Sequence, residues 1–247
     1  MAEETKPLEY INEVILKKRR SNEDWAIRRK QQLEERAKRS KHDNFVIKKP
    51  EQFVKEFRDK ELDLVQMKRR GSRVVQRKRA FEIPESKLLF VIRIHGRNDM
   101  HPKTRQLMYS LGLRQMFSGV FVKANDRIVK ILHKLEPYIT YGYPNFKSVN
   151  ELIYKKGLAK IKKERLPLTD NNAIEQAMGK YGIICIEDIV NEIANVGKHF
   201  KEVTSFLCPF KLNNPEKALQ GKKKRYSDGG DTGNRGAEIN ELINKMN

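Results

Sequence analysis

Apolar residues are sparse and helically spaced in the first third of the chain. Residues 10–40 predict a long helix with a thin apolar stripe and mostly charged positions elsewhere. Pro50 suits the first turn of a second helix, which continues into residues 66–80 with few apolar positions. Helices this polar have little tertiary packing of their own to hold them. We therefore expect residues 1–87 to form a basic helical extension outside the core.

A compact unit is predicted to begin at Leu88. Its first strand, residues 88–95, opens with a continuous apolar run and then alternates, which leaves Arg93 on the polar side. The predicted elements that follow are a helix from Pro102 to Gly112, a strand over 119–124, a helix capped by Asn125 or Asp126 and ended by Pro137, and a strand over 138–143. This β-α-β-α-β order over residues 88–144 predicts a small two-layer α/β unit.

Residues 145–247 have mainly helical periodicity. Ser148 and Glu151 have the spacing of a capping box, at the start of a helix that should end at Gly157. Further helices are expected to open at 169–171, to run from Ile186 to Gly197, and to occupy 239–246. Glu187 and Asp188 are expected to act as caps, and Cys185 to be buried.

A polar segment separates the last two of these helices. Residues 213–236 are rich in Lys, Gly, Asp and Asn, which is typical of a surface loop. The glycine-rich part, 228–236, follows no predicted strand and has no Gly-Lys-Ser/Thr sequence. We therefore interpret it as a flexible turn and not as a phosphate-binding loop.

Composition makes the chain strongly basic and rather poor in apolar residues. Its 247 residues include 52 Lys and Arg against 32 Asp and Glu, a formal net charge of +20. Such an excess usually means a polyanionic partner, of which nucleic acid is the commonest. Hydrophobic residues make up 38%, below the roughly 45–50% of a compact domain, so part of the chain should lie outside a core.

Other classes of partner and site have no support in the pattern. The longest apolar run, Leu88–Ile92, is far shorter than the roughly 20 residues of a membrane span, and no signal peptide follows the first Met. Two cysteines provide neither a disulfide framework nor, alone, a four-ligand zinc site. His95 and His101 lack the spacing of a metal or acid–base pair. We expect no membrane partner, no metal, no cofactor and no catalytic residue.

Positive charge gathers in stretches that are candidate contacts for a phosphate backbone. Residues 66–80 hold seven basic residues and no acid, whereas a solvated face normally mixes both signs. Solvated faces or a localisation signal are the alternative interpretation. Basic residues on an arm gain free energy by displacing counterions from a nucleic acid. The candidate RNA-binding residues in these stretches are Lys17, Lys18, Arg19, Arg20, Arg28, Arg29, Lys30, Lys68, Arg69, Arg70, Arg73, Arg77, Lys78, Arg79, Lys155 and Lys156.

The loop after the first predicted strand is a further candidate contact. Residues 96–101 are polar and basic, and Pro102 begins a helix whose free N–H groups attract anions. We interpret this loop as a phosphate contact. An ordinary polar loop is the alternative.

The sequence from residue 80 onward resembles the L-thirty type ribosomal protein family, and in its full extent the eukaryotic form of that family, large-subunit ribosomal protein L-seven. The stretches that carry the resemblance are Phe90–Ile94, His101–Thr104, Ser118–Lys123, Tyr141–Asn145, Lys147–Ile153, Leu168–Asn171, Gly182–Asp188 and Gly229–Arg235. The resemblance implies an α+β fold with a ferredoxin-like β-α-β-α-β core. This core would have an antiparallel three-stranded sheet with helices on one side, a long basic helical arm and a helical C-terminal region.

The resemblance also implies a function. It indicates a structural rRNA-binding protein of the large subunit with no catalytic activity, no cofactor and no small-molecule substrate. The implied partners are large-subunit rRNA and neighbouring ribosomal proteins or assembly factors, in the cytoplasmic ribosome after a nucleolar assembly stage. In the bacterial form the loop and helix after the first strand meet RNA. The corresponding residues here are Arg97, His101, Lys103 and Arg105.

Some positions depart from the common ribosomal form. Leu158 and Ala159 stand where Gly-Tyr is more frequent, and Cys208 stands where Trp is usual. With Pro167, these features resemble a paralogous L-seven-like branch, of which some members act on the precursor of the large subunit. The alternative function is therefore that of a pre-ribosomal factor for large-subunit rRNA maturation.

Two other classes fit the residues less well. A DNA-binding regulator of the zipper type would need leucine heptads after its basic region, and residues 40–66 have none. An RNA-processing enzyme would need clustered carboxylates for metal ions or a His-based acid–base set, and neither is visible.

Overall fold

A five-stranded sheet forms the centre of the computed structural model, which describes residues 13–40, 49–76, 86–96, 100–161, 164–215, 219–220 and 223–247. Its strand order is β6-β2-β1-β3-β7. The bounds are β1 Leu88–Arg93, β2 Ser118–Lys123, β3 Ile139–Gly142, β6 Phe210–Lys211 and β7 Gly233–Asn234. The three inner strands are antiparallel, as the resemblance implies, and confirm the predicted core.

Two edge strands extend the sheet beyond the three expected strands. β6 pairs antiparallel with β2, and β7 pairs parallel with β3. Each has two residues and so carries no alternation from which it could be predicted. The implied three-stranded sheet is therefore its inner part.

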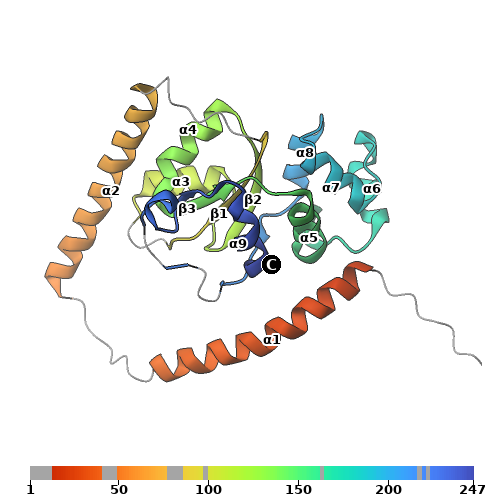
Figure 1. Cartoon of the computed structure of the whole chain (residues 1–247), viewed down its shortest axis with the longest axis horizontal. Helices are drawn as coiled ribbons and strands as arrows, with labels where there is room; N and C mark the ends of the chain where they lie inside the picture. Colours follow the sequence, from red (N-terminus) through yellow and green to blue (C-terminus); the bar gives the residue numbers. More distant parts are fainter. Residues whose placement is uncertain are drawn as a thin grey trace, which may run out of the picture.

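Helices cover both faces of this sheet (Figure 1). Leu89 and Val91 of β1 face α3 (Pro102–Ser110) and α4 (Asp126–Leu135), which pack through Met108 and Leu132. A short 3-10 helix, η1 (Glu136–Tyr138), links α4 to β3 at the predicted Pro137 stop. The first face thus has the implied arrangement of helices on one side of the core.

The C-terminal region covers the second face. Phe90 and Ile92 of β1 share a core with the remaining helices. These are α5 Phe146–Lys156, α6 Asn171–Met178, α7 Ile186–Ala194, α8 Phe200–Phe206 and α9 Ile239–Met246. Phe90 packs on Phe121 with ring centroids 4.8 Å apart, and Gly119 on β2 leaves the space that the Phe90 ring fills. Shorter elements complete the region: η2 Gly179–Tyr181, the hairpin of β4 Leu158–Ile161 and β5 Glu164–Pro167, η3 Tyr226–Asp228 and η4 Gly236–Glu238.

Two long helices, α1 (Glu13–Ser40) and α2 (Pro50–Gln76), flank the body (Figure 1). α1 lies against α5 and buries Val14, whereas α2 lies against α4 and α3 and buries Met67. Both were predicted from their periodicity. The structure also shows that they dock on the body. No helix in the described ranges is both long and apolar enough to cross a membrane.

Several local predictions are wrong. Asn145, and not Ser148, caps α5, because the Asn145 side chain accepts a hydrogen bond from the Ser148 N–H. Arg93 is only 1% exposed, because its guanidinium donates to the carbonyls of His95, Leu113 and Arg114. Cys185 is half-buried at the start of α7 and not fully enclosed.

The segment 228–236 is likewise not a flexible turn. Asp231 and Thr232 are buried, and Gly233 and Asn234 form β7 beside β3. Gly233 has a φ of +86°, which only glycine adopts without strain.

Candidate nucleic-acid interface

α2 is fixed to the body by a buried carboxylate. Asp63, 8% exposed, accepts hydrogen bonds from the main-chain N–H of His101 at 3.0 Å and the hydroxyl of Thr104 at 3.1 Å. These donors belong to the N-terminus of α3, which has unsatisfied N–H groups and a positive dipole end. A side chain of α2 thus serves as an anion for the first turn of α3.

Arg70 makes a second attachment two turns further along α2. Its Nε donates to the carbonyl oxygen of Lys134 in α4 at 3.3 Å, and its Nη2 lies 3.8 Å from Asp63. Burial lowers the pKa of the Arg70 guanidinium, while Asp63 opposes this effect. An arginine remains charged despite such a shift. Arg70 therefore anchors α2 and leaves its neighbours Arg69 and Arg73 exposed.

The C-terminal segment is fixed to the same side by a buried arginine. The Arg235 Nε donates to the Thr140 hydroxyl at 3.0 Å, and its Nη2 lies 3.5 Å from the Asp231 carboxylate. The guanidinium also lies over the Tyr226 ring, 4.4 Å from its centroid. Burial lowers the pKa of Arg235, and Asp231 opposes this effect. These contacts hold the segment that leads back to Lys223 and Arg225.

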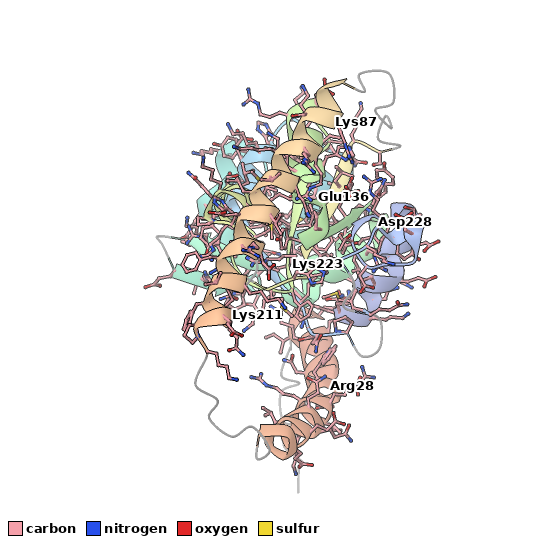
Figure 2. All side chains as sticks on the ribbon, turned by 90° about the vertical axis from the view of Figure 1, so that its left-hand side faces the viewer. Arg28, Lys87, Glu136, Lys211, Lys223 and Asp228 are labelled. Atoms are coloured by element: carbon pink, nitrogen blue, oxygen red, sulfur yellow. The ribbon has the colours of Figure 1, made fainter. Side chains whose placement is uncertain are left out.

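Arg225 and Lys223 are thereby placed opposite α2. The Arg225 guanidinium forms a two-point pair with Glu136, with Nε 3.0 Å and Nη2 3.2 Å from the carboxylate oxygens. Lys223 lies over the Tyr138 ring, 5.3 Å from its centroid. Figure 2, in which α2 faces the viewer, shows Glu136 and Lys223 beside this helix.

These elements enclose a groove of about 310 Å³, here called the α2 groove. It is lined by Gln66, Arg69, Arg70, Arg73, Glu136, Pro137, Lys223, Arg225 and Thr232. Five cations thus face one carboxylate, which Arg225 already pairs. An excess of positive charge in a concave site suits the phosphates of a nucleic-acid backbone. Arg69, Arg70 and Arg73 are sequence-predicted residues that the structure brings into this site.

Sequence reasoning missed the contribution of Lys223 and Arg225. The signal was present as four consecutive basic residues, 222–225, within the predicted surface loop. Their place opposite α2 depends on the buried Arg235 contacts and on β7, which no local pattern shows.

Other predicted residues lie elsewhere. Lys68 is exposed on α2 outside the groove, and Arg29 and Lys30 are exposed on α1. Lys18 and Lys156 are half-buried, and this burial lowers the pKa of each ammonium group. Lys17, Arg28 and Lys155 line a separate cleft between α1, α5 and α9.

The expected phosphate corner at the start of α3 is partly occupied by the chain itself. Asp63 accepts the His101 N–H, and the His101 ring accepts the Lys103 N–H at 3.1 Å. Lys103 is exposed and Arg105 is half-buried. The structure thus leaves the Lys103 side chain, more than the helix N-terminus, available for a phosphate.

Some predicted contacts fall outside the described residues. These are Arg77, Lys78, Arg79 and Arg97, together with the side chains of Arg19 and Arg20. In the part of the chain that is described, no three His, Cys, Asp or Glu side chains are grouped to hold a metal ion.

Comparison with known proteins gives matches along nearly the whole chain. The family model described as ribosomal protein L30p/L7e matches residues 89–139, and the model of the ribosomal L30 N-terminal domain matches residues 11–84. The chain is 52% identical to large ribosomal subunit protein uL30z of Arabidopsis thaliana, over 99% of both chains. It is 42% identical to uL30 of Caenorhabditis elegans, over 98% of both. It is 41% identical to uL30 of Yarrowia lipolytica, over 98% of this chain and 97% of the relative.

Proposed function

This chain belongs to the ribosomal protein L30p/L7e family, and from that premise we propose that it is a structural rRNA-binding protein of the large ribosomal subunit. The observation that carries the proposal is the α2 groove, where Arg69 and Arg73 of α2 and Lys223 of the C-terminal segment line one concave site. The protein stabilises folded rRNA by neutralising phosphates that repel each other. No bond is made or broken in this role.

The two long helices extend the RNA contact beyond the body. The exposed Arg29, Lys30 and Lys68 lie on α1 and α2, which flank the body in Figure 1. Lys103 and the predicted Arg97 would add contacts at the start of α3. Together these residues allow one protein to bridge several RNA helices, with backbone contacts that position it and carry no sequence readout.

Neighbouring large-subunit proteins are the second class of partner. The first four turns of α2 present an apolar strip that includes Phe53, Val54 and Phe57, the last of which is 67% exposed. Exposed apolar side chains on a charged helix are unfavourable in water, and they suit burial in a contact with another protein. We infer that this end of α2 meets a protein while its basic end meets RNA.

The stage of action is a finer part of the proposal. We infer that the chain joins the large subunit during nucleolar assembly and stays in the mature particle. The rival function is that of a factor confined to the precursor.

Sucrose-gradient sedimentation of separated nuclear and cytoplasmic extracts tests this function. The proposal predicts the protein in nuclear precursors and also in cytoplasmic large subunits and translating ribosomes. Confinement to nuclear precursors would support the rival function. Sedimentation as a free protein in both extracts would contradict both.

A further inference from the structure

A second basic concavity lies between α1, α5 and α9, and we call it the Trp25 cleft. Its volume is about 840 Å³. Six residues define its chemistry: Lys17, Trp25, Arg28, Lys147, Lys155 and Lys245. Two carboxylates, Asp24 and Glu151, also line it, and Glu151 is 3.7 Å from Lys155. The cleft therefore combines an aromatic ring with a net positive charge.

The aromatic ring is fixed in place before any ligand arrives. The indole N–H of Trp25 donates to the main-chain oxygen of Asn247 at 3.0 Å. The Arg28 guanidinium lies 5.4 Å from the centroid of the ring. Lys17, near the other end of the cleft, lies over the Tyr154 ring at 4.1 Å and pairs with Glu13 at 2.8 Å. These contacts dock α1 and hold the indole at the wall of the cleft.

A buried amide with unmet hydrogen-bonding capacity lies in the same place. Asn247 is 6% exposed and lines the cleft, and neither its Nδ2 nor its Oδ1 has a hydrogen-bond partner among the described residues. Buried polar atoms are nearly always paired, so two unpaired atoms on one side chain need an explanation. An amide offers one donor group and one acceptor, which is the combination found on the edge of a nucleobase.

We propose that the Trp25 cleft takes one unstacked nucleotide of an RNA strand. The base lies against the Trp25 indole and the Arg28 guanidinium plane, and a small rearrangement brings its edge to the Asn247 amide. The neighbouring phosphates lie at Lys147 and Lys245. Single-stranded RNA is commonly bound in this manner, by stacking on aromatic rings and by pairing of the backbone with cations. The cleft has a volume in the range of small-ligand sites, roughly 300–1,000 Å³.

An acidic peptide is the rival occupant, because its carboxylates would also pair with the lysines. A peptide carboxylate gains little from an aromatic ring whose N–H is already bonded to a main-chain oxygen and which lies beside a guanidinium. The observations therefore favour RNA. The inference rests on the proposed function and adds to it a recognition site for a base, distinct from the α2 groove.

Trp25 is the only tryptophan in the chain, so its fluorescence reports on this cleft alone. The full-length protein is titrated with a single-stranded oligoadenylate RNA, and binding is followed in the same samples by the anisotropy of a label on the RNA. We expect Trp25 emission to fall by about half on saturation, because stacking of a base quenches an indole. Inorganic polyphosphate and polyglutamate supply negative charge without bases and should leave the emission nearly unchanged.

A matched pair of variants tests the phosphate contacts. The double variant Lys147→Ala/Lys245→Ala should raise the RNA concentration at the midpoint of quenching by about tenfold, because contacts with the RNA backbone are lost. Lys198→Ala with Lys201→Ala removes the same charge from the exposed surface near α8, and it should leave the midpoint close to that of the parent.

The outcomes separate the two proposals. RNA binding by anisotropy with silent Trp25 emission would overturn the base site and leave the proposed function standing. Equal quenching by polyphosphate or polyglutamate would also overturn it, in favour of a general anion or peptide site. Absence of oligoadenylate binding by anisotropy would also overturn the base site, whereas absence of binding to a large-subunit rRNA transcript would contradict the proposed function itself.

Discussion

Asp63 joins two elements that no sequence pattern connects. It accepts hydrogen bonds from the first turn of α3 and lies near Arg70 of its own helix. The first task requires an acceptor, because a buried N–H and a buried hydroxyl would otherwise lose their partner, and the second requires a negative charge beside the guanidinium. Asp63, together with the Arg70 contact to α4, therefore sets the position of the basic face of α2.

Replacing Asp63 by Ala should destabilise the protein by about 2 kcal/mol, from loss of a helix cap and of a buried hydrogen bond. The change should also loosen α2, so that trypsin cleaves within residues 60–73 faster than in the parent. Asp59→Ala on the exposed side of the same helix is the control and should have little effect. Equal stability and equal cleavage rates for the two variants would show that α2 does not depend on this contact.

Asp188 gives a pH-dependent prediction. It accepts hydrogen bonds from the main-chain N–H groups of Ile184 and Cys185 at the start of α7, and these bonds lower the pKa of its carboxyl group. A lowered native pKa gives stability that is present above the unfolded value near 4 and is lost as pH falls through the native pKa.

Asp188→Ala should therefore cost about 1 kcal/mol at neutral pH, the usual value of a lost cap. The difference from the parent should shrink as pH falls below about 4, because the parent carboxylate becomes protonated there. Urea unfolding at several pH values measures it. A difference that stays constant down to pH 2 would mean that the ionised carboxylate is not what stabilises α7.

Some helix caps can be predicted from the sequence, whereas the burial of a charged side chain cannot. The caps Asp170 and Asp188 follow from residue type and position alone. The spacing of Ser148 and Glu151 predicts a capping box, but the backbone that enters α5 puts Asn145 at the N-cap. Arg93 alternates with apolar neighbours as an exposed residue would, yet it is buried and donates to the carbonyl of His95 nearby and to those of Leu113 and Arg114 from a remote segment.

At the scale of elements, α1 and α2 are helices that the body supports. Among their described side chains, Val14 is the buried apolar residue of α1 and Met67 that of α2. Ordering the backbone costs about 1–2 kcal/mol per residue, which so little buried apolar area cannot offset. Their helical state in the whole protein thus depends on contacts with α5, α4 and α3.

A peptide of residues 1–80 should accordingly be largely unfolded in solution and gain helix when RNA is added. Circular dichroism of the peptide with and without an rRNA fragment measures this. Polyphosphate at equal charge controls for simple neutralisation of the basic residues. A cooperative melting transition of the free peptide would contradict the prediction.

The long elements were predictable because each has its own periodicity. Both long helices, the three inner strands and α9 follow from the spacing of apolar residues. β6 and β7 have two residues each, which is too short for an alternation of apolar and polar residues. The β4–β5 hairpin is mostly exposed and therefore lacks an apolar face that a pattern could reveal. The glycine-rich segment seemed flexible by composition but is ordered by Arg235 and Thr140.

At the scale of the whole molecule, the α2 groove combines residues that are remote in sequence. Arg69 and Arg73 were predicted as RNA contacts from a run of basic residues. This run is the part of the site that could be predicted from the sequence. Lys223 comes from the opposite end of the chain, and its position depends on β7 and on the Arg225–Glu136 pair. Charge patterning predicts a polyanion partner but cannot show which charges share a surface.

The salt dependence of RNA affinity tests the central claim most directly. The variant Arg69→Ala/Arg73→Ala/Lys223→Ala is compared with Lys180→Ala/Lys198→Ala/Lys201→Ala, which removes equal charge from the side of the molecule that carries α6 and α8 (Figure 1). Binding to a large-subunit rRNA transcript is measured across salt concentrations. We expect the groove variant to reduce the log–log slope by about 2–3, since each lost phosphate contact contributes roughly 0.7–0.9, and the control to keep the parent slope. Equal slopes for the two variants would contradict the assignment of the α2 groove as an RNA-binding site.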